Sequence, residues 1–242
     1  MSKFHWSAIV FAFAGFTMII LKVGWFILAA YIMLWLLFWF LMSFMIRSNF
    51  FINVIHQTSK NNVLLSFDDG PHQEYTPQIL EVLKKHNAKA MFFIIGKNVE
   101  GNEQLLKRIH NEGHIVGNHT QNHKVGIGFN STQKVINEID KCSELLSKEG
   151  VDVKYFRPPF GVTNPNIAKA IEKTGLSCVG WTLRSFDTTK SNAEQLLAKM
   201  VSRVKGGDVV LFHDTQKVTV ALLDKFLIEV KKKGLTLNAE IL

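Results

Sequence analysis

The sequence predicts an α/β fold around a parallel sheet: a distorted or incomplete (β/α) barrel of about seven units, preceded by an N-terminal transmembrane segment. Short apolar runs alternate with stretches of helical length from residue 63 to the end of the chain. This alternation is typical of βα units. A chain of 242 residues is long enough for one such domain. An open doubly wound sheet is the alternative that the pattern leaves open.

Seven apolar runs are expected to form strands, because they are short, rich in aliphatic and aromatic residues, and bounded by turn residues. They are Val63–Phe67, Ala90–Ile95, His114–Asn118, Tyr155–Arg157, Ser177–Leu183, Asp208–Phe212 and Leu235–Ile241. A barrel places its chemistry at the carboxyl ends of its strands. Polar residues that directly follow these runs are therefore the first candidates for a functional site.

Six helices are expected between the strands, over residues 76–86, 102–111, 131–148, 164–173, 191–205 and 218–233. Thr76 is expected to cap the first of them with Pro77 at its first position, and Ser131 and Ser191 to cap two others. Gly175 ends the fourth, since glycine readily takes the left-handed conformation that terminates helices.

The first 46 residues have the composition of a membrane segment. Lys3 and Lys22 are their only charged side chains. Val23–Ile46 is an uncharged run of 24 residues, long enough to cross the hydrocarbon layer as a helix. Ser7–Leu21 has 15 residues and is short for a span. The pattern therefore leaves open a helical hairpin that turns at Lys22–Gly24, or a single anchor preceded by an interfacial segment.

These observations divide the chain into a membrane anchor of one or two helices (1–47), a linker (48–62) and a globular domain (63–242). A cleaved signal peptide is less favoured, because no small-x-small cleavage site closes the apolar stretch. For a hairpin, Lys3, Arg47 and Lys60 lie on one side of the membrane against Lys22 on the other. A bias this small leaves the side of the globular domain undecided.

Residues 47–242 carry a formal charge of +6, from 26 basic and 20 acidic residues. The charges are scattered, whereas nucleic-acid binding needs a dense basic stripe with interleaved aromatics, so no nucleic-acid partner is expected. The two cysteines, Cys142 and Cys178, have no metal-binding or redox spacing. No obligate protein partner is inferred.

Two groups of residues have the chemistry of a catalytic metal site. Asp68 and Asp69 leave the first strand together, and a cation bound by one of them relieves their repulsion while the other serves as base. His119 and His123 follow the third strand at a spacing that puts both on one face of a helical turn. Two imidazoles and one carboxylate form a three-point face that leaves positions for water and substrate.

Three further segments end strands with candidate residues. Arg157-Pro158-Pro159-Phe160 is a rigid loop that can aim the Phe160 amide at a developing oxyanion, while Arg157 pairs with a carboxylate. Asp187 lies just beyond a strand and can orient a histidine, although a loop aspartate explains it equally well. His213 ends a buried strand as a possible general acid or a core residue.

Five segments, in their order along the chain, resemble the polysaccharide deacetylase family. They are Ser66-Phe67-Asp68-Asp69-Gly70-Pro71, His119-Thr120-Gln121-Asn122-His123, Phe156-Arg157-Pro158-Pro159-Phe160-Gly161, Trp181-Thr182-Leu183-Arg184-Ser185-Phe186-Asp187 and Val209-Val210-Leu211-Phe212-His213-Asp214. This family is also called the NodB-homology family or carbohydrate esterase family 4. The likeness runs from about residue 63 to residue 235. The resemblance implies a distorted (β/α) barrel that removes acetyl groups from sugars with zinc or another divalent ion.

Residue roles follow from this resemblance by position. It implies that Asp68 is the catalytic base, positioned by Arg157, and that His213 is the general acid, tuned by Asp187. It also implies that Asp69, His119 and His123 bind one divalent ion, expected to be zinc. The Phe160 N–H would donate to the oxyanion, and Leu211 would line the pocket for the acetyl methyl group.

One position departs from the family pattern: Thr188 follows Asp187, where a tryptophan is commonest. Trp181 or Phe186 is expected to supply the missing aromatic surface.

The expected activity is the metal-dependent hydrolysis of N-acetyl groups from N-acetylglucosamine-type sugars of a cell-envelope polysaccharide, which releases acetate. This function favours the cell-envelope side of a membrane for an integral membrane enzyme. The alternative is a deacylase of a membrane lipid-linked sugar intermediate. A non-catalytic glycan-binding membrane protein is less favoured, because it predicts a degraded metal triad.

Overall fold

A curved, eight-stranded parallel sheet forms the centre of the computed structural model, which describes residues 2–190 and 192–241. The strands are β1 (Val54–Ile55), β2 (Leu64–Asp68), β3 (Ala90–Ile94), β4 (Ile115–Asn118), β5 (Tyr155–Phe156), β6 (Ser177–Val179), β7 (Leu183–Arg184) and β8 (Val209–His213). Their order across the sheet is β1-β6-β5-β4-β3-β2-β8-β7. The fold is thus the distorted, incomplete barrel that the sequence predicts.

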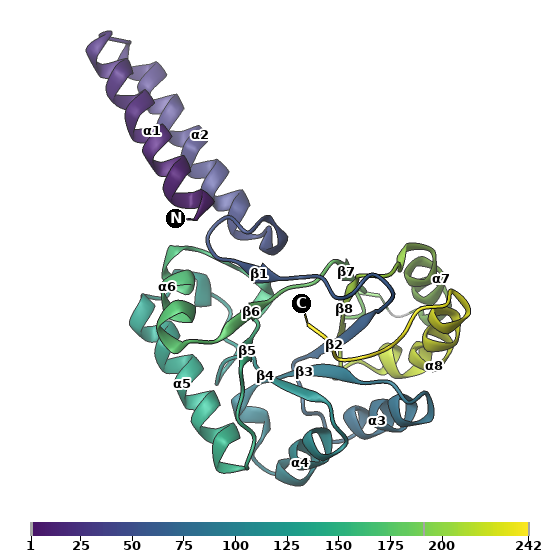
Figure 1. The fold of residues 1–242 in the computed structure, drawn as a ribbon. Helices are drawn as coiled ribbons and strands as arrows, with labels where there is room; N and C mark the ends of the chain where they lie inside the picture. The colour runs from purple at the N-terminus through teal and green to yellow at the C-terminus, as the bar shows by residue number, and fades with distance from the viewer. Residues whose placement is uncertain (1, 191, 242) are drawn as a thin grey trace.

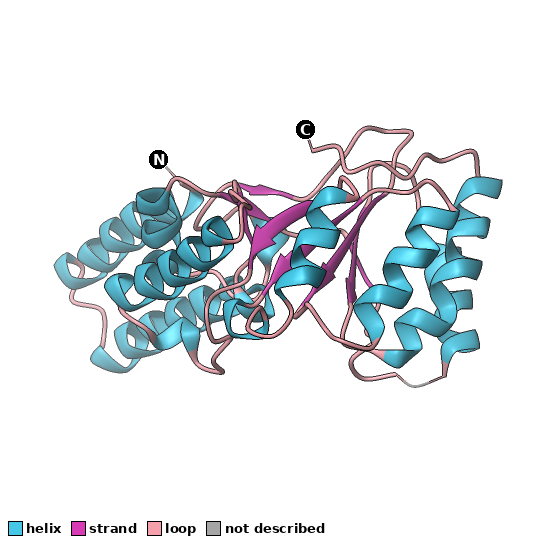
Figure 2. Ribbon diagram, turned by 90° about the horizontal axis from the view of Figure 1, so that it is seen from below, coloured by secondary structure: helices cyan, strands magenta, loops and turns pink. Residues whose placement is uncertain are grey.

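The helices of the globular part form an outer layer around this sheet (Figures 1 and 2). They are α3 (Tyr75–Lys85), α4 (Glu103–Asn111), α5 (Thr132–Lys148), α6 (Pro165–Thr174), α7 (Ala193–Arg203) and α8 (Lys217–Lys232). Short 3-10 helices lie at Ile46–Ser48, Gly96–Asn98, Ile127–Phe129 and Pro159–Gly161. One apolar core fills the space between sheet and helices, and a smaller one fills the concave interior of the barrel.

The expected helix caps are only partly found. Ser131 accepts from the Lys134 N–H, and Gly175 ends α6 at φ 70°. Thr76 lies inside α3 instead of capping it, because its hydroxyl is bonded to the buried Asp214 carboxylate. The expected cap Ser191 lies outside the described residues.

The predicted strand Ser177–Leu183 is two strands in the structure. Gly180 N donates to Ile55 O at 2.8 Å, whereas Thr182 N donates to Val209 O at 2.9 Å. The chain therefore changes partner within three residues, from one edge of the sheet to the other. One continuous strand cannot pair on both edges, so the run divides there.

The predicted C-terminal strand Leu235–Ile241 is wrong. This segment makes only an isolated bridge, between Thr236 and Asn62, in the described part of the chain. Lys89 N also donates to Leu237 O, so the segment crosses the first residues of neighbouring strands instead of running beside one strand. Ala239 and Ile241 pack against the interior core and close the amino-terminal end of the barrel.

Two antiparallel helices, α1 (Lys3–Ile20) and α2 (Trp25–Ser43), project from the globular part as a hairpin (Figure 1). Tyr31 stacks on Phe11 and donates its hydroxyl to the Phe11 carbonyl. Neither helix has a buried residue, and each is long and apolar enough to cross a membrane. A signal sequence near the N-terminus has the same character.

The base of the hairpin is joined to the globular part. Ile46 is buried and packs in the core beneath α5 and α6, and Thr163 N donates to Ser43 O at 2.8 Å. The segment 48–62 also contains strand β1, which pairs with β6. The division into anchor, linker and domain stays a prediction, but these contacts mean that a cut at residue 48 would remove part of a core.

Replacing Phe226 by alanine should destabilise the fold by about 3–5 kcal/mol, a typical cost for truncating a buried phenylalanine. Its ring is fully buried in α8, with its centroid 5.5 Å from that of Phe212. Denaturant unfolding of the full chain in detergent measures the change. The control Phe129→Ala alters a side chain that is 91% exposed and should stay within about 0.5 kcal/mol. Equal losses in both variants would contradict the described core.

Candidate metal centre and active site

Asp69, His119 and His123 converge at the carboxyl ends of β2 and β4, and one potential ligand atom from each lies within 4.8 Å of the others. Asp69 has φ 75°, which turns the chain sharply as it leaves β2. His119 directly follows β4 and is buried. The parallel register of β2, β3 and β4 brings these strand ends together.

The loop after β4 is not helical, so the expectation of two histidines on one helical turn is wrong in its local geometry. Thr120 has φ 69° and His123 has φ 50°, and these left-handed residues reverse the chain. Glu138 on α5 clamps the loop by accepting from the Asn122 N–H at 2.9 Å and from its side-chain amide at 2.8 Å. The two imidazoles meet because of this turn.

The donor set fits a divalent ion. His119 Nε2 and His123 Nε2 lie 3.5 Å and 3.4 Å from Asp69 Oδ1, and this buried oxygen has no hydrogen-bond partner among the described residues. Tetrahedral ligands about 2.0–2.1 Å from a zinc ion lie roughly 3.4 Å apart. The orphaned carboxylate oxygen therefore lies at the ligand–ligand spacing of a zinc site from both nitrogens.

Both imidazoles are prepared to act as ligands. His119 Nδ1 hydrogen-bonds the Arg157 carbonyl at 2.7 Å, which leaves Nε2 free to face Asp69. Burial, together with the charge of His119, lowers the pKa of His123 to about 4. The ring is thus neutral near pH 7, as a metal ligand must be.

Asp68 is held by a fully buried cation. Arg157 has no exposed surface, and its Nη1 donates to Asp68 Oδ1 at 2.6 Å. The other oxygen of this carboxylate lies 3.7 Å from His119 Nε2, beside the metal cluster. The ion pair therefore fixes one oxygen of Asp68 and leaves the other facing the site.

His213 is oriented by Asp187, which the sequence left open as a loop aspartate. His213 Nδ1 lies 2.8 Å from Asp187 Oδ1, and Thr219 donates to the second oxygen of the same carboxylate. Burial lowers the pKa of His213, but the hydrogen bond and charge of Asp187 outweigh it, and the net pKa is raised. The Nε2 atom faces Asp69, 4.0 Å from its Oδ2.

Phe160, Trp181 and Leu211 border the same region. Phe160 has φ 59°, its ring lies 4.8 Å from that of His123, and its N–H makes no backbone hydrogen bond among the described residues. Trp181 packs so closely on Gly161 that a Cβ there would lie 2.3 Å from the indole. Leu211 is buried in β8, in register with Ser66.

Sequence analysis missed the supporting residue Asp214. This carboxyl group is fully buried, and burial raises its pKa to about 7 despite a hydrogen bond from Thr76. A Cβ on Gly70 would lie 2.1 Å from its Oδ2, so this glycine lets the loop after β2 pass over the carboxyl group. The position of Asp214 directly after His213 was the available signal.

Comparison with known proteins identifies the family. The polysaccharide deacetylase family model matches residues 56–179. A peptidoglycan-N-acetylglucosamine deacetylase of Bacillus cereus is 37% identical over 177 residues, which cover 71% of this chain and 83% of that protein. The chain belongs to the polysaccharide deacetylase family. This family is also called carbohydrate esterase family 4. Together with the Asp69, His119 and His123 cluster, membership makes this protein a metal-dependent hydrolase, as the sequence predicts.

Solved structures of the family share this deacetylase's fold. A peptidoglycan N-acetylglucosamine deacetylase in complex with an N-oxidanyl-benzamide is 34% identical, with a TM-score of 0.71, and the match covers 76% of this chain and 87% of that chain. A family 4 pseudoenzyme from Bacillus anthracis is 26% identical, with a TM-score of 0.72, and the match covers 77% and 66%. The fold alone is therefore compatible with loss of activity, and the site residues must carry the argument for catalysis.

Removing one imidazole from the cluster of this deacetylase should weaken metal binding by at least about 100-fold, the upper range for removing an outer-shell partner. His119→Ala is the test, with metal content after dialysis as the readout. His110→Ala, which removes an exposed imidazole on α4, is the control and should retain the ion. Full metal retention by His119→Ala would contradict the assignment of the site.

Proposed function

We propose that this deacetylase hydrolyses the N-acetyl groups of N-acetylglucosamine units in peptidoglycan and releases acetate. The observation that carries the proposal is that two acid–base groups lie beside one candidate metal cluster, each held by a buried partner. Asp68 is paired with Arg157, and His213 is paired with Asp187. The Bacillus cereus relative, a peptidoglycan-N-acetylglucosamine deacetylase, supports this choice of substrate. Anchoring through the hairpin, with the domain on the cell-envelope side, would hold the enzyme beside this polymer.

In the proposed site, Asp69, His119 and His123 hold a divalent ion. The mixture of two imidazoles and one carboxylate favours zinc. When bound by these residues, the ion would supply Lewis-acid polarisation of the acetamide carbonyl. The Phe160 N–H, without a backbone partner, is available to the oxyanion that develops on the same carbonyl. Leu211 supplies an apolar surface for the acetyl methyl group.

Two protein groups move the protons. The oxygen of Asp68 that does not contact Arg157 accepts a proton from the attacking water, whose oxygen bonds to the carbonyl carbon. His213 donates the proton on Nε2 to the departing amine as the C–N bond breaks, while Asp187 stabilises the charged ring. The products are acetic acid, which ionises to acetate, and a free glucosamine amine. One water is consumed, and the proton left on Asp68 is lost to solvent while His213 regains one from solvent.

A membrane lipid-linked amino sugar is the second candidate substrate, favoured by one specific contact. Thr163 N donates to Ser43 O, so the loop that presents Phe160 is attached to the last turn of α2. If α2 spans the membrane, the active site lies near the bilayer surface. Acetate release from lipid-linked N-acetylglucosamine that exceeds release from peptidoglycan would favour this candidate.

Asp68→Asn should lower the rate of acetate release by at least about 100-fold, the usual contribution of a general base. Purified full chain is assayed with peptidoglycan and with chitooligosaccharide, with zinc and with EDTA. The metal content of the variant serves as the control, because Asp68 lies outside the proposed ligand set and the ion should be retained. Unchanged turnover in a metal-loaded variant would rule out Asp68 as the base.

The pH dependence tests the pairing of Asp187 with His213. His213 must be protonated to donate, so activity falls as pH rises through its pKa, which Asp187 raises. Asp187→Asn removes the charge that raises the pKa of His213, while burial continues to lower this pKa. The alkaline limb of the kcat profile should therefore move to lower pH. The exposed Asp152→Asn should leave it in place. An alkaline limb that does not move in Asp187→Asn would contradict the proposed tuning.

A further inference from the structure

A groove of about 1070 Å³ lies between the base of the hairpin, strand β7 and the loop that precedes β8. One wall comes from residues 44–48, which follow α2, and the rest of the lining from residues 56–57, 181–184, 186, 203 and 205–208. None of the residues that the polysaccharide deacetylase site uses for metal binding or proton transfer lines this groove. Its contents therefore need a separate explanation.

Four cationic side chains line the groove and lack a carboxylate partner. They are Arg47, Arg184, Arg203 and Lys205, all exposed, and no salt bridge involves them within residues 2–190 and 192–241. Asp208 is the acidic residue in the lining, and its carboxylate is already bonded to the Thr182 hydroxyl and the Lys205 backbone N–H. The groove thus carries four cationic side chains against one buried carboxylate, an excess of positive charge.

The cations are partly organised by neighbouring groups. Arg47 Nη1 donates to the Thr182 carbonyl at 3.1 Å, which ties the base of the hairpin to the loop between β6 and β7. The Arg184 guanidinium lies 5.1 Å from the centre of the Phe186 ring, and Lys199 Nζ lies 4.8 Å from the same centre. Cation–π contacts hold positive charges near the ring but do not neutralise them.

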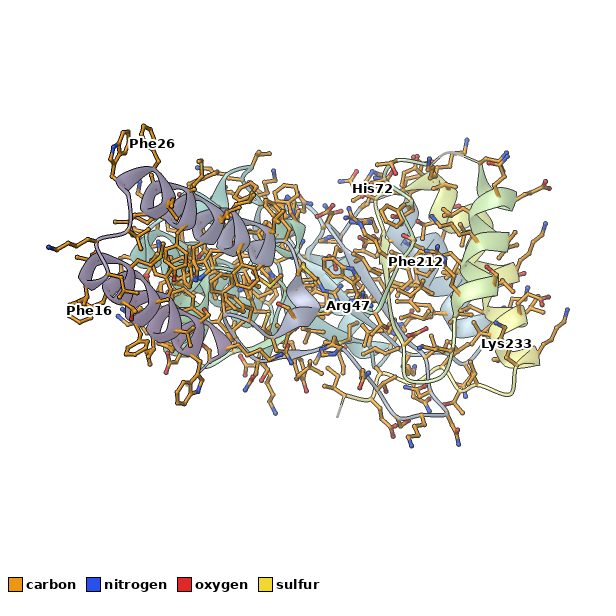
Figure 3. All side chains as sticks on the ribbon, turned by 90° about the horizontal axis from the view of Figure 1, so that it is seen from above. Phe16, Phe26, Arg47, His72, Phe212 and Lys233 are labelled. Carbon is orange, nitrogen blue, oxygen red and sulfur yellow. The ribbon has the colours of Figure 1, made fainter. Side chains whose placement is uncertain are left out.

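The groove lies at the level where α2 would leave a bilayer. Phe44 and Met45 follow α2 directly, are more than half exposed and line the groove. Arg47 is the first charged residue after the apolar helix and stands at the foot of the hairpin in Figure 3. Apolar side chains that adjoin a cationic cluster match the boundary between acyl chains and phosphate headgroups.

We propose that this groove binds the phosphate-bearing headgroup of an anionic membrane lipid, with its acyl chains along Phe44 and Met45. The bound headgroup holds the catalytic domain in a defined orientation on the bilayer, because the groove connects the hairpin base to β7 and the loop before β8. The proposal rests on insertion of the hairpin in the membrane and is independent of which glycan is deacetylated.

Lipid retention by the full chain in mild detergent tests the proposal. The protein is incubated with equal amounts of phosphatidylglycerol and phosphatidylcholine, repurified, and its bound lipids are quantified by mass spectrometry. The native chain should retain phosphatidylglycerol preferentially. A basic residue near an anionic surface contributes about fivefold in affinity, so the double variant Arg184→Gln/Arg203→Gln should reduce this preference by at least about tenfold.

Two matched variants separate a specific site from general charge. Lys141→Gln/Lys148→Gln removes two exposed, unpaired cations from α5, on the opposite side of the barrel from α7 (Figure 1), and should keep the preference. Arg184→Lys/Arg203→Lys keeps the charge and should retain most of it. An equal loss in the α5 variant, or equal retention of the two lipids by the native chain, would overturn the proposal.

Two further measurements separate the sources of failure. Inorganic phosphate, at an ionic strength matched with chloride, should not displace the bound lipid; efficient displacement would mean a free-anion site and would refute the lipid assignment. A native chain that stays soluble without detergent would refute membrane insertion and the proposal with it. Acetate release from chitooligosaccharide is followed on the same samples and should be equal in all variants, so loss of catalysis is recognised separately.

Discussion

The buried guanidinium of Arg157 is the interaction on which the centre of this enzyme depends. It donates to Ser66 and Asp68 on β2, and to the carbonyls of Val179 and Gly180 at the end of β6. These hydrogen bonds cross the interior of an incomplete barrel, whose two edge strands do not pair with each other. A buried charge is costly unless its hydrogen bonds are satisfied, so the four partners must stay in place together. The same residue therefore links the strands of the barrel and orients the carboxylate of Asp68, the proposed base.

The proposed base and the proposed acid are held in the same way, each by a buried partner of opposite charge. Asp68 is bonded through one oxygen to a buried cation, and His213 is bonded through one nitrogen to a buried anion. In each case the remaining atom faces the metal cluster. Rigid partners on the protein side reduce the reorganisation that catalysis requires, because the acting atoms are already oriented. The left-handed turns at Asp69 and His123 store local strain that this packing must hold.

The N-terminal hairpin is more than a tether to the domain. Ile46 is part of a core, Ser43 accepts a backbone hydrogen bond from the loop after Phe160, and Arg47 reaches Thr182. Figure 3 shows Phe16 and Phe26 at the far end of the hairpin and Arg47 at its base. Contacts on both sides of the site limit how far the domain can rotate about the hairpin. The orientation of the active site relative to a membrane would follow from these contacts.

The sequence alone determined the parallel α/β architecture, because alternating apolar runs are local signals, and the motifs at the strand ends predicted which residues gather at the candidate site. The tertiary structure decided what depends on distant partners. Ser177–Leu183 divides because its two halves pair with opposite edges of the sheet, and Leu235–Ile241 closes the barrel because it crosses strand ends. The histidine turn, the buried Asp214 and the groove at Arg47 likewise arise from segments far apart in the chain. Local propensity carries no information about such neighbours.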